Sequence, residues 1–318
     1  MPEVRVDPLS GLKTIIAGAR AGRPNALFEL APGESVDPAR DPFAPGNEDQ
    51  TPPTLYQDGD PWRVRAFANL YPALEPGASA PERDHNPDLF TAQAAGGSHE
   101  VIVNAAEPVT SLSDLGPDQV ALAVDAWRER MRAHAGAACR HLIVNEGREA
   151  GASLPHTHAQ LYALDFVPAA IARERERFGA YAVRTMGGNL LADLVQEEVR
   201  RRERIVAIDD EAVLMAPYAS RSPYHLLIAP RQTRARFEDE GPSGAALLHD
   251  ALRRLKARLG ASPPLNLWVR TACSGAEHFC WRIEIQPRLA ALAGLELGTG
   301  VNVCIVAPEQ AAAELREL

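Results

Sequence analysis

Hydrophobic residues recur with two different spacings along this chain, and these spacings predict its strands and helices. Apolar and polar residues alternate in half-buried strands, whereas apolar residues three or four positions apart form one face of a helix. The pattern of the first half predicts strands over 61–75, 99–104 and 141–144, a loop over 76–95 and a helix over 118–134. The residues before 61 are rich in Pro, Gly and Asp, and we expect them to be mostly irregular.

The second half of the chain repeats this order of elements. Its pattern predicts strands over 212–215, 224–229, 265–270 and 278–285, and a helix over 244–259. A helical linker over 168–206 separates the halves, and a last helix begins at Pro308, because proline suits a first helical turn. A strand–strand–helix–strand–strand unit that occurs twice predicts an α+β fold, with two antiparallel sheets backed by helices. We place the two halves at residues 1–170 and 171–318.

Three polar side chains stand at alternate positions in the strand that follows residue 144. These side chains belong to His156, His158 and Gln160, and the apolar run 161–164 follows them directly. We therefore expect them to share one face of a strand. The loop before them offers backbone N–H groups and the Ser153 hydroxyl to anionic oxygens. An imidazole near neutral pH can attack phosphorus and later leave. A His-x-His tripeptide alone is more often structural or a metal-binding pair, so the longer pattern has to carry the argument.

The longer pattern is Asn-x-Gly-x-x-x-Gly-x-Ser-x-x-His-x-His-x-Gln, and it runs from Asn145 to Gln160. It resembles the active-site signature of the galactose-1-phosphate uridylyltransferase family, a branch of the histidine-triad superfamily. This resemblance implies a duplicated histidine-triad-like fold in which His158 becomes nucleotidylated. It also implies that Gln160 and Ser153 stabilise charge on the phosphoryl oxygens, and that His156 supports the loop.

The resemblance extends over nearly the whole chain and implies further binding residues. For the nucleotide it implies Arg20, Arg23, Phe67, Asn69, Asn145, Gly151, Ser153 and His156. For the sugar phosphate it implies Glu296 and Asn302. Guanidinium groups suit the first pair because they bind phosphate in a bidentate way. From the residues alone, the two arginines could equally be surface charges and Phe67 a core aromatic.

The chain departs from the family at the residues that bind zinc. The resemblance implies a structural zinc held by two Cys, a His and the first His of the motif. The Cys positions hold Asp41 and Ala44, the third falls near Pro108, and only His156 is kept. One imidazole and at best one carboxylate do not make a tetrahedral zinc site. We therefore predict no metal cofactor here, and expect hydrogen bonds and packing to replace the zinc.

A second metal site, which some members of the family have, also departs from the pattern. Glu174 and His278 match two of its ligands, but Cys280 and Arg282 stand at later positions. Arg is not a metal ligand, and its charge opposes a cation. We predict that this site is lost as well, although the sequence leaves open whether any metal binds near Glu174 and His278.

Composition limits the location and the partners of the protein. The chain has 318 residues and a net charge of −9, and this acidity argues against a nucleic-acid-binding surface. No apolar run approaches a membrane span, and the first residues lack an apolar signal core, so we expect a cytoplasmic protein. In that compartment the four Cys should be reduced and form no disulfide framework. The resemblance implies a homodimer.

We therefore expect an enzyme, a nucleotidyltransferase of ping-pong mechanism. It would move UMP between a UDP-sugar and a sugar 1-phosphate, as in galactose and carbohydrate metabolism. An adenylyltransferase or phosphorylase that acts on a dinucleoside polyphosphate or adenylyl sulfate is an alternative, and so is a nucleotide-binding protein without turnover. A hydrolase is a third option, but smaller histidine-triad proteins carry a further His where this chain has Gln160. The base, the acceptor and the pathway stay open at this point.

Overall fold

The computed structural model describes residues 1–23, 27–30, 35–79 and 89–318. The first half supplies the strands β3 (Thr54–Asp58), β4 (Val64–Ala68), β5 (Gly97–Val103), β6 (Cys139–Glu146) and β7 (His158–Leu164). The second half supplies β8 (Ile205–Ile208), β9 (Ala212–Met215), β10 (Leu226–Pro230), β11 (Leu265–Arg270) and β12 (Arg282–Pro287). The predicted strands are confirmed with shifted ends, and part of the expected 76–95 loop lies outside the described residues.

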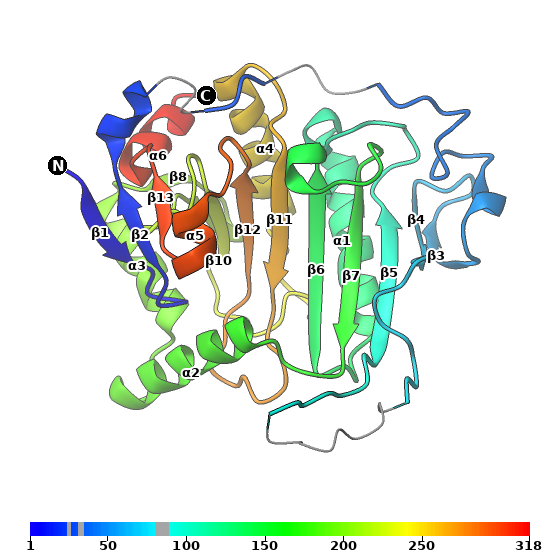
Figure 1. Cartoon of the computed structure of the whole chain (residues 1–318), viewed down its shortest axis with the longest axis horizontal. Coiled ribbons are helices and arrows are strands. Elements are labelled where there is room, and N and C mark those ends of the chain that lie inside the picture. Colours follow the sequence, from blue (N-terminus) through cyan, green and yellow to red (C-terminus); the bar gives the residue numbers. More distant parts are fainter. Residues whose placement is uncertain (24–26, 31–34, 80–88) are drawn as a thin grey trace.

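All ten strands form one antiparallel sheet (Figure 1). The strand order is β3-β4-β5-β7-β6-β11-β12-β10-β9-β8. Outward from the central β6–β11 pair, corresponding strands of the two halves follow in the same order. The α+β class is confirmed. The two expected antiparallel sheets are present as the two five-stranded halves of this sheet, and they join where Ile143 lies opposite Trp268. The boundary at residue 170 stays a prediction.

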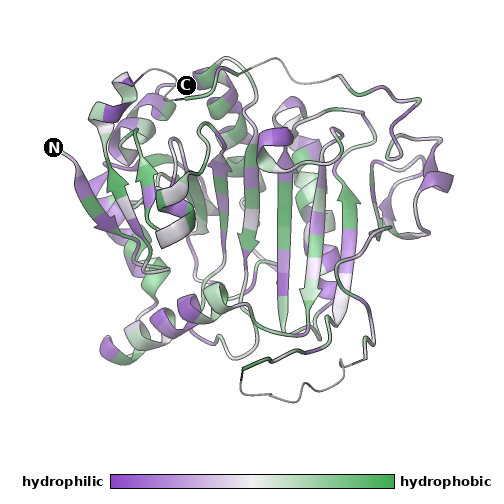
Figure 2. Cartoon of the chain, in the orientation of Figure 1, coloured by the Kyte–Doolittle hydropathy of each residue, from purple (hydrophilic) through white to green (hydrophobic). Residues whose placement is uncertain are grey.

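Two helices cover one face of the sheet, as the sequence predicts. They are α1 (Pro117–Ala133), behind the first half, and α4 (Ala245–Leu259), behind the second, and they contact each other (Figure 1). Figure 2 shows hydrophobic and hydrophilic residues following one another along the central strands. The hydrophobic set, with Leu142, Ala159 and Leu161, packs under α1 in the main core. The alternating polar set of β7, which includes His158, therefore faces away from these helices.

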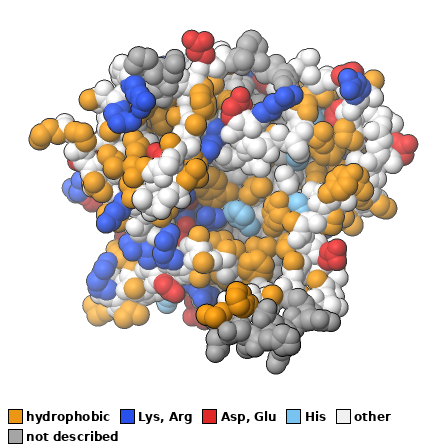
Figure 3. All heavy atoms as spheres, viewed as in Figure 1, with side chains coloured by type: hydrophobic (Ala, Val, Ile, Leu, Met, Phe, Trp, Pro, Cys, Tyr) orange, Lys and Arg blue, Asp and Glu red, His pale blue; other side chains and the backbone are white. Residues whose placement is uncertain are grey.

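The opposite face of the sheet is covered only in part. The linker forms α2 (Ala169–Arg184) and α3 (Leu190–Arg201), as expected, and these helices pack on β9 and β10 through a second hydrophobic cluster. Figure 3 shows a hollow on this face, in front of the central strands, where His and basic side chains gather. The polar face of β7 therefore lies on the partly covered side of the sheet.

The remaining elements stand at one end of the main sheet and near the motif loop. A three-stranded sheet is made of β1 (Glu3–Val6), β2 (Lys13–Ile16) and β13 (Asn302–Cys304). The helices nearby are α5 (Gly294–Thr299) and α6 (Pro308–Arg316), and the short 3-10 helices are η1 (Gly18–Gly22), η2 (Glu48–Gln50), η3 (Leu112–Asp114) and η4 (Arg148–Ala150). The expectation of irregular chain before residue 61 is wrong for β1, β2 and β3, because such short strands give little periodic signal.

The expectation that all cysteines are reduced is contradicted for one pair. Cys139 and Cys273 form a disulfide, with their Cα atoms 4.6 Å apart. Cys139 begins β6 and Cys273 follows β11, so the pairing of these strands brings the two residues together from 134 positions apart. The bond links the two halves of the sheet. None of the helices in the described ranges has the length and apolar character needed to span a membrane.

Candidate active site

His158 begins β7 and presents one ring nitrogen to the hollow face. Its Nδ1 lies 2.8 Å from the backbone oxygen of His156, and because a carbonyl only accepts, Nδ1 must carry the ring proton. The lone pair is then on Nε2, which has no hydrogen-bond partner within the part of the chain that the structure describes. The ring of Phe43 lies edge-on at 5.1 Å between centroids. A backbone carbonyl therefore orients the ring of His158.

Burial keeps the His158 ring neutral. The side chain is only 6% exposed, and desolvation lowers the pKa of His158, with a further lowering from the neighbouring His156. The hydrogen bond to the His156 carbonyl opposes this shift in part. A neutral imidazole with a free Nε2 lone pair is the form that can act as a nucleophile.

His156 lies just before the strand and is fully buried. Its Nδ1 is 2.6 Å from Oδ2 of Asp41, and its Nε2 is 2.9 Å from the backbone oxygen of Ala105. The interpretation that His156 supports the loop agrees with these contacts, because both ring nitrogens are taken up by the protein. Asp41 was not recognised as a functional residue from the sequence, since it lies 115 positions away from its partner.

Thr157 fixes the main chain between the two histidines from the helix side. Its hydroxyl donates to Oε1 of Glu146 at 2.8 Å and accepts from the side-chain amide of Asn104 at 3.1 Å. The Glu146 carboxylate also accepts from the Leu112 N–H and the Ser111 hydroxyl. Burial raises the pKa of Glu146, and these hydrogen bonds offset part of that rise. Sequence reasoning missed this anchor because its members are apart in the chain.

Gln160 lies on the same face of β7 as His158, as predicted. The N–H of Ala73 donates to Nδ1 of His99, so the proton of this neutral ring is on Nε2 and is donated to Gln160 Oε1 at 2.9 Å. Burial lowers the pKa of His99, which favours this neutral form. The Tyr162 hydroxyl approaches the same oxygen at 3.3 Å. With its oxygen occupied from two sides, Gln160 has its NH2 group left to donate.

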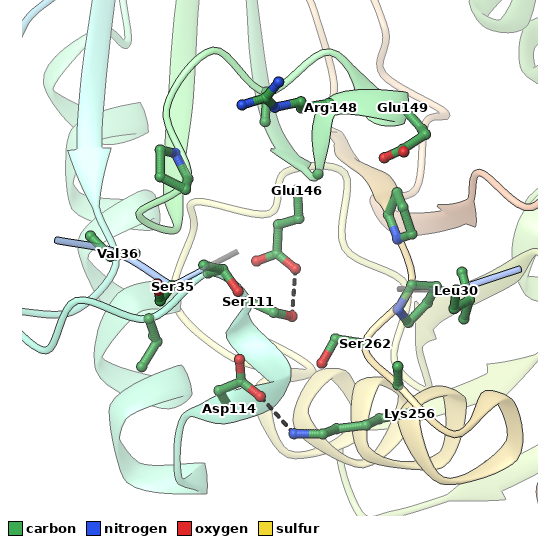
Figure 4. Close-up of a pocket in the computed structure, with 18 of the residues that line it drawn as sticks. Leu30, Ser35, Val36, Ser111, Asp114, Glu146, Arg148, Glu149, Lys256 and Ser262 are labelled. Atoms are coloured by element: carbon green, nitrogen blue, oxygen red, sulfur yellow. Dashed lines mark hydrogen bonds and ion pairs between the residues drawn. The ribbon is translucent and has the colours of Figure 1, made fainter. Parts of the chain in front are cut away.

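The motif loop forms one wall of a cavity of about 870 Å³. Figure 4 shows Glu146, Arg148 and Glu149 on the loop side of this cavity, opposite Lys256 and Ser262. The volume is that of a small-molecule site. His158 is not among the described lining residues, so the cavity adjoins the nucleophile through the loop and does not contain it.

The predicted residues of the motif loop lie at the cavity or beside it, and their roles toward a phosphate stay predictions. Ser153 is exposed and lines the cavity. Gly147 and Gly151 have φ angles of 81° and 86°, which favour glycine, and a Cβ on Gly147 would lie 2.8 Å from Pro264. Asn145 accepts a hydrogen bond from the Asn266 side chain at 2.8 Å, across the joint between the halves.

Two residues of the predicted nucleotide site lie on or just after β4. Phe67 is 2% exposed and packs in a cluster with Phe43, Trp62 and two valines, so its ring is part of the core. Asn69 is half-buried, and its amide nitrogen lies 3.2 Å from His99 Nε2. Their roles toward a nucleotide stay predictions, and Asn69 is the one that stands next to the Gln160 contacts.

Four predicted residues do not come together with His158 within one chain. Arg20 and Arg23 are exposed at η1, Glu296 is on α5, and Asn302 begins β13. These elements lie at the end of the molecule away from β7 (Figure 1). Glu296 accepts a hydrogen bond from the Ala293 N–H in its own helix cap. Their roles stay predictions that a single chain does not satisfy.

The residues considered for a second metal site are engaged elsewhere. Glu174 is buried and accepts from Arg282 at 2.9 Å, with Arg270 at 3.5 Å. His278 is exposed, in the loop before β12. A search of the described residues finds no group of three or more His, Cys, Asp or Glu that could hold a metal ion.

The duplicated sheet with its His-x-His-x-Gln strand defines the class of this protein, a nucleotidyltransferase. A family model described as "Galactose-1-phosphate uridyl transferase, N-terminal domain" matches residues 1–168, and one described as "Domain of unknown function (DUF4921)" matches residues 90–317. The first match covers more than half of the chain. The chain therefore belongs to the galactose-1-phosphate uridyl transferase family.

Individual relatives match over almost their full lengths. An ADP-glucose phosphorylase of Arabidopsis thaliana is 27% identical, over 100% of this chain and 93% of its own. A galactose-1-phosphate uridylyltransferase of Haemophilus influenzae is 26% identical, over 100% of this chain and 94% of its own. A crystal structure of an ADP-glucose phosphorylase from Arabidopsis thaliana with bound ADP-glucose superposes with a TM-score of 0.82, at 26% identity, over 100% of this chain and 99% of that one.

Proposed function

We propose that this enzyme transfers a nucleoside monophosphate from a nucleoside diphosphate sugar to a phosphorylated acceptor, through a covalent intermediate on His158. The observation that carries the proposal is the geometry of the ring. The His156 carbonyl occupies Nδ1 at 2.8 Å and so assigns the lone pair to Nε2, on a side chain that burial keeps neutral. UMP is the first candidate for the transferred group, and a sugar 1-phosphate is the first candidate for the acceptor.

In the first step, the Nε2 lone pair attacks the α-phosphorus. An N–P bond forms, the bond from this phosphorus to the bridging oxygen breaks, and the sugar 1-phosphate leaves with the electron pair. The ring keeps its proton on Nδ1, and the His156 carbonyl stabilises the positive charge that develops there. The sugar 1-phosphate can leave without a proton. We therefore assign neither a general acid nor a metal ion to this step.

In the second step, a phosphate oxygen of the acceptor attacks the same phosphorus and the N–P bond breaks. Splitting the transfer into two displacements is the usual advantage of covalent catalysis. The NH2 group of Gln160 and the hydroxyl of Ser153 are our candidates to stabilise the phosphoryl oxygens, each worth about 10²–10³-fold in rate if aligned. Gln160 suits this role because His99 and Tyr162 occupy its oxygen.

A second candidate is adenylyl transfer from ADP-glucose. Full-length similarity to an ADP-glucose phosphorylase, and to a crystal structure of one with bound ADP-glucose, supports it. In that case inorganic phosphate would be the acceptor, as the name of the relative indicates. The covalent step on His158 is the same in both candidates, and they differ in the base pocket and in the acceptor.

We further propose that the enzyme works as a homodimer in the cytoplasm. Arg20, Arg23, Glu296 and Asn302 lie away from β7 in one chain. In a dimer, these four residues of one chain would lie near His158 of the other chain. Arg20 and Arg23 would then contact the nucleotide, and Glu296 and Asn302 the sugar phosphate. Size measurement of the purified protein, with and without nucleotide, tests this part independently.

The test of the covalent step is intact-mass measurement after incubation with UDP-glucose or with ADP-glucose. The proposal expects an acid-labile uridylyl or adenylyl adduct, and the base of the faster-forming adduct identifies the donor. Adding glucose 1-phosphate or inorganic phosphate should then discharge the adduct, and the effective acceptor separates the two candidates.

Two variants make the mass experiment specific. His158→Ala should form no adduct, whereas the matched control His249→Ala on α4 should behave as the unchanged protein. An adduct that persists in His158→Ala would refute the assigned nucleophile. Tight nucleotide binding without any adduct would instead indicate a binding protein without turnover.

A further inference from the structure

The zinc site that the family resemblance implies does not fit the residues of this chain. Zinc would need a lone pair from His156, but Asp41 and the Ala105 carbonyl occupy both of its nitrogens, at 2.6 and 2.9 Å. At the second cysteine position, Ala44 offers only a buried methyl group, and Pro108 offers no ligand at the third. A tetrahedral Cys/His zinc centre cannot be assembled from this set.

The contacts of His156 determine how many protons the pair holds. The Ala105 carbonyl accepts only, so Nε2 of His156 must carry a proton. The short contact from Nδ1 to Asp41 Oδ2 requires a second proton between these two atoms. The other carboxylate oxygen of Asp41 accepts from the Phe43 N–H at 3.0 Å, so both of its oxygens are held. The pair therefore holds two protons, one on Nε2 and one in the hydrogen bond between Nδ1 and Asp41.

We infer that the buried, hydrogen-bonded pair of Asp41 and His156 takes the place of a structural metal ion and positions the His158 nucleophile. The side chains of the pair are 3% and 0% exposed. Two hydrogen bonds fix the His156 ring, and this fixes the backbone carbonyl of the same residue, which in turn orients the ring of His158. Asp41 and His156 are thus positioning residues and touch no substrate.

The pair acts on the nucleophile through position. Burial is the main reason that the pKa of His158 is lowered, and the effects of His156 and Asp41 on this pKa oppose each other. The effect on catalysis rests on the proposed function, whereas the proton count and the absence of zinc can be tested without it.

Proton NMR of the His156 ring tests the proton count. The unchanged protein should show two ring-contact protons that exchange slowly with solvent, because both hydrogen bonds are buried. In Asp41→Ala the proton of the contact between Nδ1 and Asp41 should be lost, while the Nε2 proton stays. A folded unchanged protein with no proton between Nδ1 and Asp41 overturns the inference.

Metal analysis tests the replacement of zinc. The unchanged protein, expressed with added zinc and then desalted, should hold no stoichiometric zinc, and a chelator should leave its thermal unfolding temperature unchanged. Stoichiometric zinc whose removal lowers that temperature would overturn the inference. Zinc that binds only to Asp41→Cys, and not to the unchanged chain, would support it.

Kinetics test whether the pair positions the nucleophile or only stabilises the fold. Asp41→Ala should lower kcat for adduct formation by about 10–100-fold with KM unchanged, which is the usual effect of losing such a supporting contact. The matched control Asp250→Ala removes a carboxylate that pairs with arginines on α4, and it should leave kcat unchanged. An unchanged kcat in folded Asp41→Ala would show a structural role only and overturn the positioning claim.

The two proposals fail in different ways. If no nucleotide gives an adduct, the function assigned to His158 falls, while the NMR and zinc results still decide the state of Asp41 and His156. If the adduct forms but no proton lies between His156 Nδ1 and Asp41, only the replacement of the metal ion by this pair falls.

Discussion

The strands β7 and β12 occupy equivalent places in the two halves of the sheet, but they use their polar faces in opposite ways. Ile143 and Trp268 pair at the centre of the sheet, and their outer partners are Gln160 and Glu284, so these two residues occupy equivalent positions. Two residues earlier in each strand, Arg282 of β12 then corresponds to His158 of β7. In β7 the polar side chains leave a nitrogen lone pair and an amide NH2 group without partners among the residues that the structure describes. In β12 the corresponding side chains bond to each other.

The network around β12 is fully buried and ionic. Arg282 donates to Glu284 at 2.8 Å and to Glu174 of α2 at 2.9 Å. Burial opposes ionisation of both partners, but Arg282 together with Arg221 holds the pKa of Glu284 well below its usual range. The two carboxylates likewise raise the pKa of Arg282 against the effect of burial. The charges of Arg282 and Glu284 are thus paired within the protein, although Nη1 of Arg282 has no hydrogen-bond partner among the described residues.

The comparison teaches how one duplicated scaffold can hold one reactive site. A nucleophile needs a lone pair that the protein leaves unpaired, and β7 provides this by satisfying only the remote atoms of His158 and Gln160. Even the supporting histidines correspond, since His99 beside Gln160 matches His225, whose Nε2 lies 3.4 Å from Glu284. The difference between the halves therefore lies in two side chains of each strand and not in the backbone.

The largest expected effect is at the nucleophile itself. Substitution of His158 by Ala should lower the rate of nucleotidyl transfer at least about 10⁴-fold, because the covalent route is removed. The free energy of unfolding should change far less, since the main core lies on the other face of β7. Transfer assays and urea unfolding on the same preparation check both expectations. Retention of more than about a tenth of the rate would contradict the role of the ring.

Making β7 resemble β12 is the next test. Gln160→Glu replaces the amide donor by a carboxylate beside His99, so repulsion of the phosphoryl oxygens should lower kcat about 10²–10³-fold. Folding should be kept, because the new oxygen can accept the same hydrogen bond. Single-turnover adduct formation measures the effect. A rate within about tenfold of the unchanged enzyme would show that Gln160 does not face the phosphate.

The reciprocal change in β12 should affect stability and not chemistry. Glu284→Gln leaves the buried Arg282 with one carboxylate partner and should lower the free energy of unfolding by about 3 kcal/mol. The rate of transfer per folded molecule should stay within about threefold, as no step of the reaction is assigned to this network. Urea denaturation and the transfer assay measure the two quantities. A large loss of rate with unchanged stability would mean that the second half shares in the chemistry.

The sequence predicts those parts of this comparison that depend on local pattern. The helices expected over 118–134 and 244–259 lie at Pro117–Ala133 and Ala245–Leu259, because long amphipathic periods are hard to mistake. His158 and Gln160 lie on the same face of β7, and this follows from the alternation of side chains in a strand.

What the sequence does not predict are contacts between distant segments. Asp41 and His156 are 115 positions apart, and Cys139 and Cys273 are 134 apart. No periodicity marks such partners, because the fold and not the local chain brings them together. The joining of the two half-sheets escaped prediction for the same reason, since each half alone satisfies its own hydrogen-bonding pattern up to the edge strand.

The smallest expected effect concerns the joint between the halves, where the ionic network touches the first half. His141 of β6 lies 3.4 Å from Arg270, and burial together with this cation lowers the pKa of His141 to about 3. In the unfolded chain the same ring has a pKa of about 6.5. Between about pH 3 and pH 6.5 the ring is therefore protonated in the unfolded state and neutral in the folded state. The free energy of unfolding should therefore fall with decreasing pH, by roughly 1 kcal/mol per pH unit from this residue, from about pH 6.5 downward.

The variant His141→Gln isolates this contribution, because glutamine does not titrate. Its free energy of unfolding, measured by urea denaturation across pH 4–8, should fall less steeply below about pH 6.5 than that of the unchanged protein. Above about pH 7 the His141 ring is neutral in both the folded and the unfolded protein. The curves of the two proteins should therefore run parallel there, and this range serves as the internal control. Equal slopes over the acidic range would mean that His141 accepts its proton in the folded state, and that the charge of the β12 side does not extend across the joint.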